Sequence, residues 1–248
     1  MRFFYAAIRG ETHMKQQSIP IGHIPAILWG DASDRLVLAV HGSGSHKADV
    51  PLSTLAEIAA ARGWQVLSFD LPGHGDRRAD SAQCVPQVCV PEVQTVFHAL
   101  EGRWNRIRLF ANSLGAYFSL LALAGQPVER AWFLSPVVDM RRLIENMMQW
   151  FGVSKERLRA EGQIGTPIGQ TLSWDYYRYV CGHPVERWDI PTFILYGERD
   201  EMCERDTVEA FTDRFGAKLT IVPGSEHYFH TPGQIAALRG WLERTWDT

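Results

Sequence analysis

The sequence predicts an α/β fold in which a mostly parallel sheet is covered by helices on both faces. Apolar, strand-like runs alternate with segments of helical spacing along most of the 248 residues. Several of these runs are apolar without interruption, which is typical of strands buried on both faces of a parallel sheet. A hydrophobic content of 46% suffices for one full core at this length.

The first half of the chain sets the pattern. Residues 16–30 are expected to form an antiparallel pair at the sheet edge, joined near Gly22. The apolar run 35–42 ends in glycine and predicts a buried strand. Apolar residues at helical spacing and a glycine stop predict a helix over 51–63, and the next strand is expected over 64–70.

The later elements repeat this alternation. A turn-rich stretch after residue 70 leads to a helix over 91–102, which Pro91 opens. The remaining strands are expected over 106–112, 130–136, 193–200 and 217–224, and the remaining helices over 113–125, 205–216 and 231–246.

The alternation stops over residues 137–189, which have helical patterns and no convincing strand. We therefore expect an α/β core of residues 1–136 and 190–248 and a helical cap over 137–189. Open α/β sheets bind ligands at the carboxyl ends of their strands, so the cap should lie over that edge. Its larger side chains either form a small core or line a pocket. They are Met140, Met147, Met148, Trp150, Phe151, Trp174, Tyr176, Tyr177 and Tyr179.

A serine, an acid and a histidine follow three different predicted strands. Ser113 follows the strand over 106–112, Asp200 ends the strand region after the insertion, and His227 follows the last strand. The carboxyl ends of parallel strands meet at one sheet edge, so these side chains should lie near one another. This chain order is the one that α/β-hydrolases use.

Five motifs carry a resemblance to that superfamily, which extends from about residue 20 to the C-terminus. They are HGSG at 41–44, DLPGHG at 70–75, ANSLG at 111–115, YGERD at 196–200 and GSEH at 224–227. The chain departs from the G-x-S-x-G pattern at Ala111, where the family usually has glycine. Alanine is the smallest residue with a Cβ and is therefore tolerable in a tight strand-to-helix turn.

The resemblance implies a role for each residue. Ser113 is the nucleophile, His227 takes its proton, and Asp200 orients the imidazole and stabilises its charged form. The backbone N–H groups of Ser43 and Leu114 are expected to hold the oxyanion of the tetrahedral intermediate. Leu114 also begins a helix, whose positive end favours that developing charge.

Simpler interpretations exist for these residues. A serine before a helix is usually an N-cap, and an isolated loop histidine usually lies at the surface. Asp139 competes with Asp200 for the role of the acid. It begins the insertion and precedes Arg141 and Arg142, a pattern typical of a capped helix with basic partners of its own.

Three further histidines are weaker candidates. His230 stands at an expected helix start, while His41 and His74 are interpreted as structural residues of a loop and a turn. The glycines at 161–171 are interpreted as a loop, with a mobile gate as the alternative.

Composition excludes several classes of protein. The net charge of −3, from 25 basic and 28 acidic residues, offers no concentrated basic face for nucleic acid or an acidic membrane. No apolar run approaches the roughly 20 residues of a membrane span. No cysteine and histidine spacing suggests zinc, and GSGSHK at 42–47 does not match a phosphate loop.

The ends of the chain and its thiols give further expectations. No export signal is recognised, so we expect a cytoplasmic protein with reduced thiols. Cys84 and Cys89 are close enough in sequence for a bridge, which we do not favour. Residues 1–13 are interpreted as a poorly ordered extension before an alternative start at Met14.

We therefore expect a serine hydrolase, first of all a carboxylesterase, that cleaves a small ester-like substrate through an acyl-enzyme without metal or cofactor. Thioester and peptide substrates stay open because the triad does not specify the leaving group. A homodimer also stays open. A non-catalytic ligand-binding protein on the same fold is the alternative from another class. A dehalogenase or epoxide hydrolase is set aside because position 113 is serine and not a carboxylate.

Overall fold

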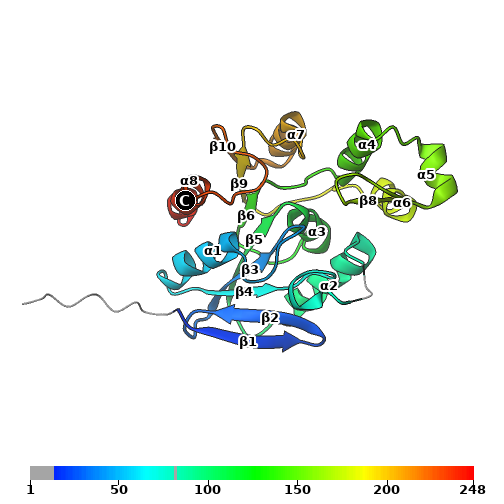
Figure 1. The fold of residues 1–248 in the computed structure, drawn as a ribbon. Coiled ribbons are helices and arrows are strands. Elements are labelled where there is room, and N and C mark those ends of the chain that lie inside the picture. The colour runs from blue at the N-terminus through cyan, green and yellow to red at the C-terminus, as the bar shows by residue number, and fades with distance from the viewer. Residues whose placement is uncertain (1–13, 81–82) are drawn as a thin grey trace, which may run out of the picture.

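The computed structural model describes residues 14–80 and 83–248, so the expectation about residues 1–13 lies outside the described residues. The strands of the main sheet are β1 (Gln16–Ile21), β2 (Ile24–Trp29), β3 (Arg35–Val40), β4 (Gln65–Phe69), β5 (Arg106–Asn112), β6 (Ala131–Leu134), β9 (Thr192–Gly197) and β10 (Lys218–Val222). They form an eight-stranded sheet in the order β1-β2-β4-β3-β5-β6-β9-β10 (Figure 1). β2 pairs antiparallel with β1 and β4, and the other neighbours are parallel.

Helices cover both faces of this sheet, which confirms the predicted fold class. The helices of the core are α1 (Val50–Ala60), α2 (Pro86–His98), α3 (Leu114–Ala122), α7 (Arg205–Phe215) and α8 (Pro232–Thr245). α1 and α8 share one apolar cluster, in which Leu55 and Trp241 are buried. α2, α3 and α7 contribute to the cluster on the other face, with Val93, Phe118 and Val208 among its members. No helix in the described ranges combines the length and apolarity needed to cross a membrane.

The insertion, residues 137–189, contains α4 (Met140–Trp150), α5 (Lys155–Glu161), β7 (Gln163–Gly165), β8 (Thr171–Ser173) and α6 (Trp174–Gly182). Its helices lie together on the side of the molecule that also holds α2 and α3, away from α1 and α8 (Figure 1). The expectation of no strand here is wrong, because β7 and β8 pair as an antiparallel hairpin. Strands of three residues are too short for an alternating pattern to appear. The glycine-containing turn lies inside this hairpin, where Thr166 N–H donates to Gln170 O at 2.8 Å.

α2 begins five residues earlier than Pro91, the expected first residue, because Pro86 opens it and Pro91 lies within it. Proline inside a helix leaves the carbonyl four residues before it without its usual N–H donor. That residue, Gln87, is exposed, as is Pro91, so water can solvate the free carbonyl. The expected start of this helix was wrong because either of the two prolines could open it.

Candidate active site

Ser113 occupies the turn between β5 and α3 with φ 49° and ψ −118°. This region is unfavourable for a residue with a Cβ, at a cost of about 1–3 kcal/mol that the surroundings must offset. Two hydrogen bonds hold the turn: Ser113 N–H donates to Leu134 O at 3.0 Å, and Ser113 O accepts from Val137 N–H at 3.1 Å. The backbone at β6 therefore fixes the position of the serine.

The side chain of Ser113 does not cap α3, although the residue precedes that helix. The side chains of Ser154 and Thr231 do accept hydrogen bonds from N–H groups of the helices they precede. The Ser113 hydroxyl instead lies 2.8 Å from Nε2 of His227. The simpler interpretation of this serine as a helix cap is therefore wrong.

Close backbone contacts explain the small residues around this turn. A Cβ on Gly115 would lie 2.4 Å from His41 O and 2.6 Å from Val40 O, so only glycine fits there. Ala111 is fully buried but belongs to the regular part of β5, where its Cβ is sterically allowed. The departure from the family pattern at Ala111 is therefore accommodated without strain.

His227 joins the serine to an acid. It lies in the loop after β10, and its Nδ1 lies 2.7 Å from Oδ2 of Asp200. The side chains of His227 and Asp200 are only 5% and 0% exposed. Ser113, His227 and Asp200 thus form one continuous hydrogen-bonded chain, in which the acid and the histidine are almost closed to solvent and the serine is half-buried.

The turn after β9 sets the direction of the Asp200 carboxylate. Its Oδ1 accepts the backbone N–H groups of Met202 and Cys203, each at 2.9 Å, which leaves Oδ2 for His227. Gly197 lets the two loops meet, since a Cβ there would lie 2.4 Å from Glu226 O. The structure therefore brings Asp200, and not Asp139, to the histidine.

Asp139 has a different position and a different partner. It precedes α4, and its Oδ1 accepts the Arg142 N–H at 2.9 Å, so the predicted helix cap is present. The expected basic partners are otherwise engaged: the side chain of Arg141 pairs with Glu145 and that of Arg142 with Glu204. That part of the expectation is wrong because both arginines extend along the helix surface toward other acids.

The expected oxyanion donors both border the serine. Ser43 lies in the loop after β3, Leu114 is the first residue of α3, and both line one cavity with Ser113. Two histidines hold this loop. His74 Nε2 accepts Gly44 N–H at 3.1 Å, and His41 Nε2 accepts Leu71 N–H at 3.0 Å.

His41 has the structural role that the sequence suggested. It is fully buried, and its Nδ1 donates to Gly42 O at 2.8 Å. Burial lowers its pKa from 6.5 to about 4, so the ring is neutral at pH 7. A neutral ring is required here, because Nε2 must accept a hydrogen bond while Nδ1 donates one.

A buried ion pair anchors the same loop to the turn after β4. The ammonium of Lys47 contacts Asp70 Oδ2, and Lys47 N–H donates to Asp70 Oδ1 at 2.8 Å. Burial opposes the charge on Asp70, yet its hydrogen bonds to Lys47 and Asp76 lower its pKa overall. The DLPGHG turn, with the short helix η1 (Gly75–Arg77), therefore wraps around one carboxylate.

Sequence reasoning did not find the contact between His74 and Gly44 or the ion pair between Lys47 and Asp70. Each joins residues of two loops that are 23 to 30 positions apart. The HGSGSHK and DLPGHG motifs follow neighbouring strands, β3 and β4, and that adjacency was the available signal.

Two cavities open beside Ser113. The apolar cavity, of about 480 Å³, lies between Ser113 and the insertion. Its apolar wall includes Met140, Leu143, Ile144, Met147, Leu172 and Tyr176. The polar cavity, of about 350 Å³, lies on the side of α1. Its polar wall includes Ser45, Asp49, Asn112, Ser135, His227 and His230.

The large side chains of the insertion take both expected roles, with Met148 and Tyr177 buried in the core, while Trp150 takes neither. Met140, Met147 and Tyr176 line the apolar cavity. Trp150 is 49% exposed, and the Tyr177 hydroxyl donates to Glu145 at 2.7 Å. Cys84 also lines the apolar cavity and is unbridged, with its sulfur 3.7 Å from that of Cys89.

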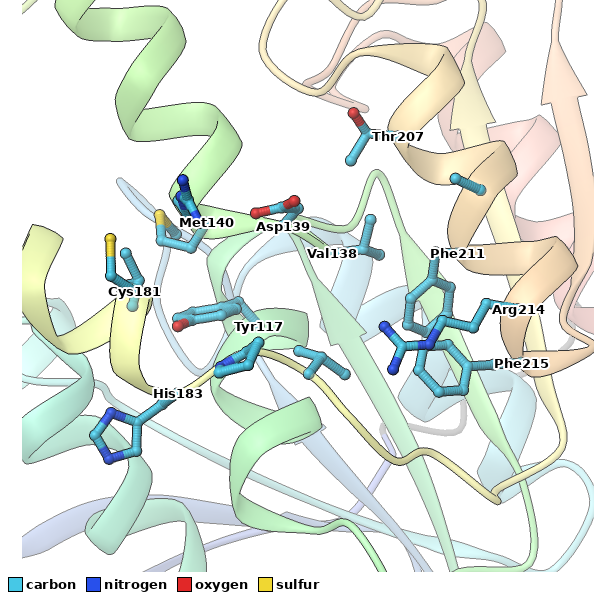
Figure 2. A pocket seen from close by; sticks show the side chains of 15 residues that line it. Tyr117, Val138, Asp139, Met140, Cys181, His183, Thr207, Phe211, Arg214 and Phe215 are labelled. Atoms are coloured by element: carbon cyan, nitrogen blue, oxygen red, sulfur yellow. The ribbon is translucent and has the colours of Figure 1, made fainter.

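A third cavity, of about 350 Å³, lies between the two ends of the insertion and α7. Figure 2 shows Tyr117 in its wall, with Asp139 and Met140 from one end of the insertion and His183 from the other. Neither Ser113 nor His227 borders it. It is therefore separate from the hydrogen-bonded chain.

One group of potential metal ligands overlaps this site. Ligand atoms of Asp200, Cys203 and His227 lie within 4.8 Å of one another. Both Asp200 oxygens already accept hydrogen bonds, and burial raises the pKa of the Cys203 thiol, which disfavours the thiolate that a metal requires. These residues do not fit a metal centre.

Comparisons with solved structures agree with the fold. Solved structures of similar fold include Est1E from Butyrivibrio proteoclasticus with ferulic acid bound, at 19% identity and a TM-score of 0.72, covering 94% of this chain and 100% of that one. Mouse alpha/beta hydrolase domain-containing protein 10 has 14% identity and a TM-score of 0.74, covering 94% and 98%. The Pyrococcus furiosus esterase Pf2001 has 18% identity and a TM-score of 0.65, covering 94% and 92%.

Sequence comparisons identify the family. No curated protein matches the sequence significantly. A family model described as the alpha/beta hydrolase family matches residues 37–238, which is most of the chain. Together with the sheet order and the turn at Ser113, this match shows that the chain belongs to the alpha/beta hydrolase family.

Proposed function

We propose that this hydrolase is a serine esterase that cleaves a carboxylic ester through an acyl-enzyme. The observation that carries the proposal is the direction of the Ser113 hydroxyl. It is held in a strained turn and directed at His227, and it leaves the helix behind it uncapped. That arrangement activates a nucleophile and has no evident structural benefit.

The first half-reaction forms the acyl-enzyme. Ser113 Oγ attacks the ester carbonyl carbon while its proton passes to His227 Nε2, 2.8 Å away. The imidazolium that forms is stabilised by the buried Asp200 carboxylate. The carbonyl oxygen becomes an oxyanion, for which Ser43 and Leu114 supply N–H donors. His227 then protonates the leaving-group oxygen, and the alcohol departs.

The second half-reaction releases the acid. His227 takes a proton from water, which attacks the acyl carbon and forms a second tetrahedral intermediate. Collapse of this intermediate returns the proton to Ser113 Oγ and frees the carboxylic acid. Side chains and backbone of this chain supply every group that these steps use, so the proposal needs no metal or cofactor.

The apolar cavity supports short to medium acyl chains as substrates. Its volume of about 480 Å³ and its wall of methionine, leucine and isoleucine suit an apolar acyl group of limited size. Thioesters and peptides undergo the same chemistry. The ester is preferred because the structure of Est1E has ferulic acid, a carboxylic acid, bound and Pf2001 is named an esterase.

Turnover of p-nitrophenyl esters of increasing acyl length tests the proposal. We expect hydrolysis of short and medium chains and a decline for long ones. Ser113→Ala should lose this activity and unfold at the same temperature as the wild type. A non-catalytic binding protein would show no turnover above buffer for any ester. A preference for long-chain esters at an interface would contradict the acyl-size proposal.

A further inference from the structure

The apolar and polar cavities meet at the serine. Ser43, Ser113, Gln170 and Tyr228 line both of them. An ester whose carbonyl carbon sits at Ser113 Oγ has two parts that must extend away from that point. One cavity is therefore available for the acyl group and the other for the leaving group.

His227 distinguishes the two cavities. It lines the polar cavity, whereas the described residues around the apolar cavity do not include it. In acyl transfer the leaving-group oxygen receives its proton from the same histidine that activated the serine. That oxygen must come within hydrogen-bond reach of the imidazole. The leaving group therefore belongs in the polar cavity and the acyl group in the apolar cavity.

The wall of the polar cavity favours one class of leaving group. Its described residues include no lysine or arginine, and Asp49 contributes a carboxylate. An anionic group would find no permanently charged cation in this wall and one repelling carboxylate. Hydroxyl and amide side chains of Ser45, Asn112 and Ser135 lie in this wall beside apolar ones, namely Val50, Pro51, Leu134 and Phe229. Such a surface suits an uncharged group with several hydroxyls.

Two oxygens in this wall lack a partner. Within the described ranges, Asn112 Oδ1 and Ser135 Oγ are buried and make no hydrogen bond, and Ser135 is only 1% exposed. An unpaired buried acceptor is unfavourable and gains from a donor that enters its surroundings. Neither oxygen is exposed, so contact with a ligand requires each side chain to turn toward the cavity.

We propose that the polar cavity binds the leaving group of the substrate as a neutral polyol or sugar alcohol, recognised by Asn112 and Ser135. The inference rests on the proposed esterase function and deepens it. The substrate is then an ester of an apolar acid with a hydroxylated alcohol. Asn112 and Ser135 are specificity-determining residues, because they select the alcohol and take no part in the proton transfers.

Matched esters test this assignment directly. Propyl butyrate and 2,3-dihydroxypropyl butyrate share the acyl group and the carbon skeleton of the alcohol, and differ only by two hydroxyls. For the wild type we expect kcat/KM to be roughly tenfold or more higher for the dihydroxypropyl ester, since a site built for hydroxyls discriminates against analogues without them. The butyrate ester of glycolate, which carries a carboxylate, should be slower than propyl butyrate.

Variants locate the discrimination. Ser135→Ala removes one hydroxyl and should lower the dihydroxypropyl-to-propyl ratio of kcat/KM several-fold. Asn112→Ala should lower the same ratio, and it serves as the second variant if Ser135→Ala does not fold. Leu143→Ala is the matched control, because Leu143 lines only the apolar cavity. It should change the preferred acyl length and keep the ratio.

The outcomes separate this inference from the proposed function. A wild type that hydrolyses propyl butyrate as fast as the dihydroxypropyl ester overturns the inference alone. The inference is also overturned if the dihydroxypropyl-to-propyl ratio of kcat/KM stays unchanged in both variants. The two oxygens would then contact water and not the alcohol. A wild type that hydrolyses none of the esters overturns the proposed function and this inference with it.

Discussion

The Oδ2 atom of Asp200 lies 2.7 Å from Nδ1 of His227, and the other oxygen of the same carboxylate is held by two backbone N–H groups. The acid is thus oriented by the turn after β9, independently of the histidine. It fixes the ring so that Nε2 faces Ser113. Asp139 has no such contact with His227 and caps α4 instead.

Asp200→Asn should therefore lower kcat by about 10³–10⁴-fold, because the imidazole loses its tautomer and the partner of its charged form. Asp139→Asn is the matched control. Asparagine is as good an N-cap as aspartate, so kcat should stay within a few-fold of the wild type. Steady-state kinetics on one ester checks both variants, and the reverse pattern would assign the acid to Asp139.

Gly115→Ala should destabilise the fold by about 3 kcal/mol, because the new Cβ meets two backbone oxygens that cannot move aside. Gly233→Ala is the control: a Cβ there has no neighbour within 4 Å, and alanine favours the helix by up to about 1 kcal/mol. Denaturant unfolding measures both free energies. Equal stability of the two variants would contradict the close contact at Gly115.

Asp70→Asn should cost about 3 kcal/mol of stability and reduce activity, because it leaves Lys47 buried without its main partner. The control is Asp76→Asn, which removes the other acid on Lys47. The Asp76 side chain is 71% exposed, so its loss should cost less than about 1 kcal/mol. Comparable losses in the two variants would show that the buried pair does not anchor the loop.

Acid should weaken the fold through His41. Its pKa is about 4 in the folded protein against 6.5 ordinarily, so the unfolded chain binds the extra proton between these values. The stability linked to this residue is complete above pH 6.5 and falls by about 3 kcal/mol as the pH drops to 4. Glutamine can accept the Leu71 N–H and has no charged form.

The free energy of unfolding of the wild type and of His41→Gln, measured from pH 4.5 to 7.5, checks this. The advantage of the wild type over the variant should shrink as the pH falls. Parallel curves would mean that folding does not lower the pKa of His41.

The sequence predicted the sheet well because buried parallel strands are continuous apolar runs. The strand expected over 106–112 coincides with β5, Arg106–Asn112. The boundary of α2 was missed because Pro86 and Pro91 can each open a helix. The hairpin of β7 and β8 was missed because each strand has only three residues.

The site could be predicted in part. The positions of Ser113, Asp200 and His227 at the carboxyl ends of predicted parallel strands imply that they approach one another, and the structure brings them into hydrogen-bond distance. Contacts between loops, such as that of His74 with Gly44, depend on turn geometry that no local pattern encodes. The division into an apolar and a polar cavity required the positions of side chains from several elements.

The central claim is that Ser113 is a nucleophile activated by His227. The most direct measurement is covalent labelling of the purified protein with a fluorophosphonate, followed by mass spectrometry of its peptides. One adduct per chain on Ser113, absent in Ser113→Ala and strongly slowed in His227→Gln, is the predicted result. No adduct, or an adduct on another residue that persists in Ser113→Ala, would contradict the account.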